Sequence, residues 1–216
     1  IQNPKLDVNS KVCFNSNVAA SVPTRKFIKL KMKEFENHYF IGQVVNELRS
    51  IYLGAPYEYK IEYNFRNVTD KIYQDGRLRF FCNVPKWMEF LNDSDLTFGS
   101  RLHGNIAAVL AGTPALLVTK DSRTRELAEY HHLNAIHESK LNEKLTLQDL
   151  VEQQDFTQIE KYQKQNLDRY VAFLKKNDIP NIFMDGEDPQ ETAFDRKIKQ
   201  TDLLEGIVPV SQCSLE

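Results

Sequence analysis

An arginine and a histidine, Arg101 and His103, lie two residues apart between a short apolar segment and an alanine-rich one. An arginine offers a planar fork of N–H donors that suits a carboxylate or a phosphate. A histidine titrates near neutral pH and can therefore carry a proton. With Ser100 before them and Gly104 after them, the two residues predict an anion site that has a proton carrier inside it.

The flanking segments predict the elements that position this pair. Leu96 to Phe98 reads as a short strand, Gly99 and Ser100 as a turn, and Asn105 to Ala111 as a helix that Gly112 ends. Thr113 to Thr119 is an apolar run typical of a strand buried on both faces. The unit is β–α–β, which predicts a parallel sheet with a right-handed crossover. Ligands of such sheets bind at the carboxyl ends of the strands, where the backbone N–H groups of a helix N-terminus favour an anion.

Three segments of the chain resemble the polysaccharide pyruvyl transferase family. They are Gly-Ser-Arg-Leu-His-Gly-Asn-Ile-Ala-Ala from Gly99, Gly-Thr-Pro-Ala-Leu-Leu from Gly112, and Asp-Ser-Arg-Thr-Arg-Glu-Leu-Ala-Glu-Tyr from Asp121. The family places an Arg-Leu-His triplet at its donor site. The resemblance therefore implies donor-site roles for Arg101, Leu102 and His103.

The family also implies a fold, a reaction and its substrates. The fold class is α/β, a Rossmann-like parallel sheet with helices on both faces, resembling the C-terminal half of a two-Rossmann-domain (glycosyltransferase B-type) fold. The expected reaction is pyruvyl transfer from phosphoenolpyruvate, with no separate cofactor, to a sugar of an exopolysaccharide or cell-wall polysaccharide, forming a pyruvate ketal. The acceptor is a saccharide or a lipid-linked sugar. Arg101 and His103 are the predicted catalytic residues, and Ser100, Leu102, Gly104 and Asn105 are predicted to bind substrate.

Three residues outside this turn are further candidates for substrate binding. Asn15 follows the strand-like run Lys11 to Phe14, although plain turn chemistry also explains an Asn there. Family members carry an arginine near this place, and Arg25 is the nearest one here. Arg123 lies in the first turn of a predicted helix, where a positive charge opposes the helix dipole and a ligand role becomes plausible. Gln43, after Gly42, is interpreted as a strand end or bulge, with a position facing the ligand edge as the alternative.

Composition excludes several classes of function. The 216 residues carry a net charge of −2, which gives no basic surface for nucleic acid, and no apolar run has transmembrane length. Three scattered cysteines predict no disulfide framework, and Cys13 and Cys82 are expected to be buried. No Cys/His spacing predicts a metal site. These features favour a cytoplasmic protein, and they leave its oligomeric state open.

The chain divides into a predicted Rossmann-like domain, 1–180, and an irregular extension, 181–216. It begins with Ile1, and its final Leu215-Glu216 is typical of a cloning scar, so an N-terminal domain is expected to be missing. A long helix over 156–177 is predicted to bury a stripe formed by Ile159, Tyr162, Leu167, Tyr170, Val171 and Leu174. Tyr57 to Phe65 alternates aromatic and polar residues, as in a half-buried strand near the cleft.

Two other functions remain open at this stage. The chain could be the C-terminal domain of a nucleotide-sugar glycosyltransferase, although no Gly-rich diphosphate loop is visible. It could also be a non-catalytic anion-binding domain in polysaccharide assembly. At the level of single residues, Arg101 could instead bridge the start of its helix to a nearby acidic side chain.

Overall fold

The central element is a parallel sheet of six strands, seen in a computed structural model that describes residues 1–17, 19–54, 68–184 and 188–213. The strands are β1 (Val12–Asn15), β2 (His38–Gly42), β3 (Leu78–Phe80), β4 (Leu96–Gly99), β5 (Ala115–Thr119) and β6 (Ala135–His137). Their order in the sheet is β3-β2-β1-β4-β5-β6, and every pairing is parallel. The predicted α/β, Rossmann-like fold class is thereby confirmed.

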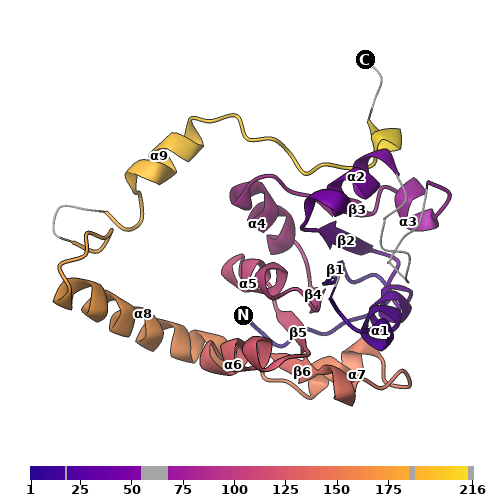
Figure 1. Cartoon of the computed structure of the whole chain (residues 1–216), viewed down its shortest axis with the longest axis horizontal. Helices are drawn as coiled ribbons and strands as arrows, with labels where there is room; N and C mark the ends of the chain where they lie inside the picture. Colours follow the sequence, from indigo (N-terminus) through magenta and orange to yellow (C-terminus); the bar gives the residue numbers. More distant parts are fainter. Residues whose placement is uncertain (18, 55–67, 185–187, 214–216) are drawn as a thin grey trace.

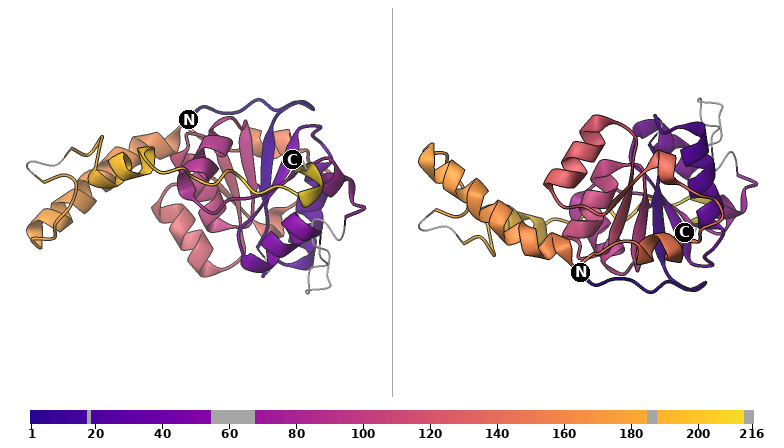
Figure 2. Two further views of the ribbon diagram at one scale, coloured as in Figure 1. Left: turned by 90° about the horizontal axis from the view of Figure 1, so that it is seen from above. Right: turned by 90° about the horizontal axis from the view of Figure 1, so that it is seen from below.

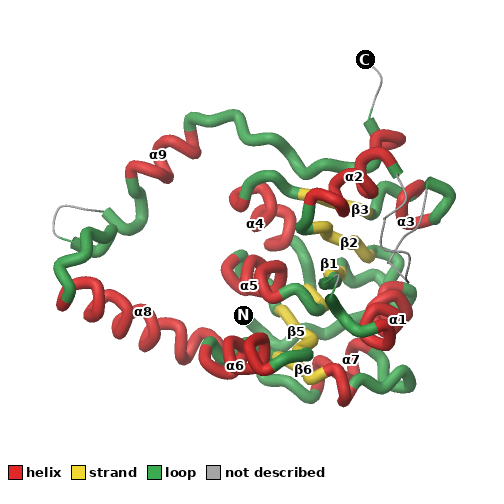
Figure 3. The backbone as a smooth tube through the Cα atoms, viewed as in Figure 1, coloured by secondary structure: helices red, strands yellow, loops and turns green. Residues whose placement is uncertain are grey.

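Helices cover both faces of this sheet (Figures 1, 2 and 3). The α-helices are α1 (Val22–Met32), α2 (Val45–Leu53), α3 (Lys71–Gln74), α4 (Val84–Asn92), α5 (Leu102–Leu110), α6 (Ser122–Tyr130), α7 (Leu147–Glu152), α8 (Gln158–Lys176) and α9 (Ala193–Lys199). The short 3-10 helices of the described ranges are η1 (Glu138–Lys140) and η2 (Val210–Gln212). Side chains of α1 and α7 pack in one core, and those of α4 and α5 pack in a second core.

Alternation along the strands separates these two cores. In β1, Val12 and Phe14 belong to the core beneath α1, whereas Cys13 belongs to the core beneath α4 and α5. Successive side chains of a strand point to opposite faces, so both faces of a central strand must be apolar. All four residues of β1 and all four of β4 are accordingly buried.

The order of the strands reverses between β1 and β4, which pair in register with Phe14 opposite Phe98 and Asn15 opposite Gly99. Consecutive connections leave this point toward opposite edges of the sheet, so the loops after β1 and β4 separate and leave a crevice at the carboxyl ends. Asn15 and Gly99 are the last residues of their strands. The fold therefore brings the Asn15 loop and the Arg101 loop to one place.

Helix α5 begins three residues earlier than the sequence predicts, at Leu102. As a result, His103, Gly104 and Asn105 lie within its first turn. The helix ends as predicted, because Gly112 follows it with a φ of 86°, a left-handed conformation that favours glycine.

The predicted buried stripe of the long helix is wrong for Leu167 and Tyr170, which are exposed, and Tyr162 and Val171 are only partly buried. Helix α8 projects away from the sheet (Figure 2), and among its residues only Ile159 and Leu174 are buried. Leu167 is 43% exposed and Tyr170 is 58% exposed. The spacing predicted an apolar face correctly, but the middle of that face, at Leu167 and Tyr170, is exposed, whereas Tyr162 stacks on His132.

The segment predicted to be irregular, 181–216, contains structure. Helix α9 begins with a capping box in which Asp195 N donates to Thr192 Oγ1 and Thr192 N donates to Asp195 Oδ2. Farther along, Ile207 forms an antiparallel bridge with Phe80 and so covers the outer edge of β3. The Thr-x-x-Asp spacing was a usable sequence signal for this helix.

Two further expectations concern the burial of the cysteines and the strand expected at Tyr57 to Phe65. Cys13 is buried as predicted, but Cys82 is exposed, because it lies just beyond the end of β3. The expected strand of Tyr57 to Phe65 lies outside the described residues.

Candidate functional site

The loops after β1 and β4 are joined by Asn15. Its Oδ1 accepts a hydrogen bond from the backbone N–H of Arg101 over 2.8 Å, and the side chain is 1% exposed. Gly99 makes this approach possible, because a Cβ there would lie 2.0 Å from the Asn15 carbonyl oxygen and 2.4 Å from its Oδ1. Asn15, a predicted site residue, therefore lies next to Arg101.

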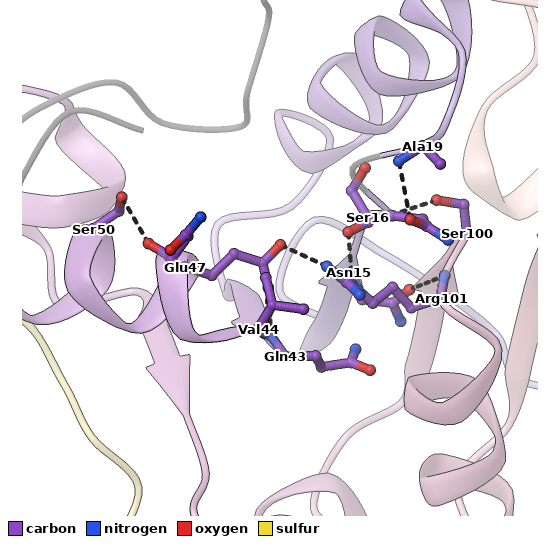
Figure 4. Close-up of polar contacts among 11 residues, drawn as sticks. Asn15, Ser16, Ala19, Gln43, Val44, Glu47, Ser50, Ser100 and Arg101 are labelled. Atoms are coloured by element: carbon purple, nitrogen blue, oxygen red, sulfur yellow. Dashed lines mark hydrogen bonds and ion pairs between the residues drawn. The ribbon is translucent and has the colours of Figure 1, made fainter. Parts of the chain in front are cut away.

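The guanidinium of Arg101 already has two partners within the chain (Figure 4). Its Nε donates to the carbonyl oxygen of Ser16 over 3.0 Å, and its Nη2 donates to Glu47 Oε1 over 3.0 Å. The side chain of Arg101 is 14% exposed and that of Glu47 is fully buried. The structure therefore shows the alternative arrangement, in which Arg101 links the start of its helix to an acidic side chain, here Glu47. Only Nη1 makes no hydrogen bond to a described residue.

Two side-chain amides lie beside Gly104. A Cβ on Gly104 would stand 2.5 Å from Gln43 Nε2 and 3.1 Å from Asn15 Nδ2. Both amide nitrogens are buried, and neither has a hydrogen-bond partner in the described part of the chain. Buried donors without partners are rare, because each costs free energy unless a ligand or water accepts from it. Gln43 is therefore a functional candidate. The sequence analysis interpreted it first as a strand end or bulge and gave a position facing the ligand edge as the alternative.

His103 and Leu102 occupy opposite sides of the first turn of α5. His103 is exposed and has no hydrogen bond with any described residue, so its ring is available to a ligand or to another domain. Leu102 is 9% exposed and packs with Leu117 and Ala128, so its side chain belongs to the core. Of the predicted triplet, Arg101 and His103 present polar side chains at the carboxyl edge of the sheet.

Asn105 and Ser100 act within the chain. Asn105 Nδ2 donates to the carbonyl oxygens of Gly99 and Arg101, over 3.2 and 2.8 Å, and its side chain is 1% exposed. Ser100 Oγ accepts from the backbone N–H of Asn17 over 2.8 Å. Both residues therefore hold the loops in shape, and the substrate contact predicted for them stays a prediction.

The two remaining predicted arginines are less closely tied to this cluster. Arg25, in α1, donates from Nη1 to the carbonyl oxygen of Ala20 over 2.9 Å. Arg123 is exposed in the first turn of α6, and its charge interacts with Asp121, the N-cap of that helix. In the described ranges, no hydrogen bond or ion pair connects Arg123 with Asn15, Gln43 or Glu47.

A small cavity of about 40 Å³ lies next to this cluster, lined by residues that include Ser100, Lys120 and Glu138. Burial raises the pKa of Glu138, but hydrogen bonds from Ser21 and Thr24 hold it net below its ordinary value. A larger cavity of about 660 Å³ is lined by His38 and Arg77, at the amino ends of β2 and β3, and so lies away from the cluster.

Neither a metal site nor a membrane span is found in the described ranges. No group of three or more His, Cys, Asp or Glu side chains there could hold a metal ion. Among the described helices, none combines the length and the apolar character that crossing a bilayer requires.

Comparison with known proteins confirms the resemblance noted in the sequence. The model of the polysaccharide pyruvyl transferase family matches residues 20–122, a range that holds Gln43, Glu47, Arg101 and His103. Asn15 and Arg123 lie outside it. No curated protein matches the chain. The family match supports a transferase that modifies polysaccharides.

A solved structure described as the glycotransferase of kitacinnamycin is similar at 11% identity and a TM-score of 0.37. The alignment covers 70% of this chain and 36% of that one, so the matched part spans about a third of the other's length.

Proposed function

We propose that this chain binds phosphoenolpyruvate at the first turn of α5 and serves as the donor half of a pyruvyl transferase acting on a saccharide. The observation that supports this most directly is the pair of buried amide donors, Asn15 Nδ2 and Gln43 Nε2, without partners among the described residues beside Gly104. They lie next to the N-terminus of α5, whose first backbone N–H groups have no partner within the helix and favour an anion. A carboxylate or phosphate oxygen would satisfy both kinds of donor.

The charges in the site indicate how such an anion would be held. The buried carboxylate of Glu47 pairs with Arg101, so the two charges largely offset each other. Neutral N–H dipoles, with Nη1 of Arg101, then supply most of the recognition. Such donors are already oriented and need little rearrangement when the anion arrives.

The proposed reaction assigns the proton to His103. Protonated His103 would give its proton to the methylene carbon of phosphoenolpyruvate, while a sugar hydroxyl oxygen bonds to the adjacent carbon and loses its own proton. A second hydroxyl of the same sugar then attacks that carbon and loses its proton as the C–O bond to phosphate breaks. The products are a cyclic ketal and inorganic phosphate. A well-placed proton donor of this kind contributes about 10²- to 10⁴-fold in rate.

Calorimetric titration of phosphoenolpyruvate tests the donor site. The wild-type chain should bind saturably, and Gln43→Met, which removes the donor at similar size, should bind about ten- to a hundredfold more weakly, as loss of a hydrogen bond to a charged group predicts. Arg101→Ala should weaken binding as well.

A matched control and a competing ligand complete the experiment. Gln200→Met changes an exposed glutamine beyond α9 and should leave the affinity unchanged. Saturable binding of UDP in place of phosphoenolpyruvate would favour the nucleotide-sugar glycosyltransferase instead. If the wild-type chain binds neither compound, the assignment of a donor site to this chain is wrong.

A further inference from the structure

One buried carboxylate holds together the groups that surround the first turn of α5. Glu47 Oε1 accepts from Nη2 of Arg101 over 3.0 Å, and Glu47 Oε2 accepts from the backbone N–H groups of Gln43 and Val44. These partners come from two loops, one after β4 and one after β2 (Figure 4). Glu47 is fully buried, in the third position of α2.

We propose that Glu47 is the positioning residue of this site, fixing the guanidinium of Arg101 and the turn that carries the Gln43 amide. The consequence for phosphoenolpyruvate binding rests on the proposed function, whereas the fixing of Arg101 does not. Glu47 makes no contact with the anion itself. It acts through Arg101 and Gln43: it holds the guanidinium of Arg101 in place and keeps Nε2 of Gln43 beside Gly104.

Capping of α2 alone does not explain this arrangement. Two other helices, α7 and α9, begin with capping boxes whose carboxylates are Asp149 and Asp195. Both of those aspartates are partly exposed, and neither forms an ion pair with an arginine in the described residues. A cap therefore needs neither full burial nor a cationic partner, and burying a carboxylate without one is unfavourable. The ion pair with Arg101 is an additional feature of α2.

The backbone before α2 is shaped for this contact. A Cβ on Gly42 would lie 2.6 Å from Ile51 Cδ1 and 3.0 Å from Glu47 Cβ. The glycine thus lets the first turn of α2 close onto the end of β2. That closure brings the Glu47 carboxylate under the Gln43 backbone and within reach of Arg101.

The test uses Glu47→Gln, Arg101→Lys and the double variant, with Asp149→Asn as the matched capping control. The Nε–H signal of Arg101 in ¹H–¹⁵N NMR, assigned by its loss in Arg101→Lys, reports whether the guanidinium is fixed. Calorimetry with phosphoenolpyruvate reports the consequence for binding. Glu47→Gln should broaden or shift that signal and weaken binding by about tenfold, the scale of a lost charge-assisted hydrogen bond. Asp149→Asn should lower the melting temperature only.

Comparing the binding losses of the single and double variants distinguishes a positioning role of Glu47 from general destabilisation of the fold. If Glu47 acts through Arg101, the double variant should bind no more weakly than the weaker single variant, because the two substitutions break one unit. Losses that add would overturn the proposal, as would an unchanged Arg101 signal in Glu47→Gln.

Further measurements decide the proposal if Glu47→Gln does not fold or if the wild-type chain does not bind phosphoenolpyruvate. If Glu47→Gln does not fold, Glu47→Asp keeps the charge while shortening the reach to Arg101, and the same two signals decide. If the wild-type chain fails to bind phosphoenolpyruvate, the proposed function is wrong, and the Arg101 signal alone then confirms or overturns the positioning role.

Discussion

Replacing Gly104 by alanine should improve the helix and damage the site. Gly104 lies in the first turn of α5 with helical backbone angles, so its conformation does not require glycine. An alanine inside a helix is about 0.5–1 kcal/mol more favourable than a glycine. The new methyl group would lie 2.5 Å from Gln43 Nε2 and 3.1 Å from Asn15 Nδ2. The Gln43 amide is the far end of a flexible side chain and can move aside at little cost, and Asn15 Nδ2 must shift by only a few tenths of an ångström.

The expected result is a chain of equal or slightly higher stability that has lost affinity for phosphoenolpyruvate. Displacing one amide donor and occupying the space beside the helix N-terminus should weaken binding by about ten- to a hundredfold. Thermal unfolding measures the stability, and calorimetric titration measures the affinity of the same preparation.

Gly112→Ala should give the opposite result, a lower stability with an unchanged affinity for phosphoenolpyruvate. Gly112 has a φ of 86°, and a Cβ added there would have no other atom within 4 Å, so an alanine at this position is strained but blocks nothing. We expect a loss of about 1 kcal/mol in the free energy of unfolding, with unchanged affinity. Unchanged affinity in Gly104→Ala, or a large loss of stability in that variant, would refute the reasoning that Gly104 is there to leave room for a ligand.

Further predictions concern Gly99 and the cysteines. Gly99→Ala should cost several kcal/mol of stability, measured by denaturant unfolding, because its Cβ would meet the Asn15 backbone at 2.0 Å; a melting curve like that of the wild type would contradict this packing. Burial raises the pKa of the Cys13 thiol to about 11, so a thiol reagent at pH 8 should label Cys82 and Cys213 in the folded chain, and Cys13 only after denaturation. The protonated Cys13 thiol stabilises the folded chain, and this stabilisation is complete below the ordinary pKa of 9.0 and is lost as the pH rises through about 11. Urea unfolding at several pH values measures this change in the free energy of unfolding. Labelling of Cys13 in the folded chain would show that it is not buried.

Local patterns determined much of the fold. The β4–α5–β5 unit was predictable because strand, turn and helix signals follow one another within Leu96 to Thr119, and each depends on nearby residues. The turn that we propose as an anion site was predictable as a strand end followed by a helix start, whose first N–H groups are donors. Arg101 and His103 were found by residue type and spacing.

The partners of Arg101 required the tertiary structure. Glu47 stands 54 residues from Arg101, and Asn15 stands 86 residues from it. Nothing local in the sequence distinguishes Glu47 from any other acid at the start of a helix. The order of the strands brings the β1, β2 and β4 loops together, and that order depends on long-range pairing.

The same distinction explains the errors at the C-terminus. Helical spacing correctly predicted that α8 has an apolar face, but spacing is a property of one helix, and burial depends on what packs against it. Leu167 and Tyr170 are exposed because the helix leaves the sheet. The sequence by itself determined most of the elements, the α/β class and the place of Arg101 and His103 at a helix start, because these depend on local spacing. Only the tertiary structure decided that Arg101 is held by a buried Glu47 and that Asn15 and Gln43 have amide donors without partners among the described residues, because contacts between distant segments follow from how the strands assemble.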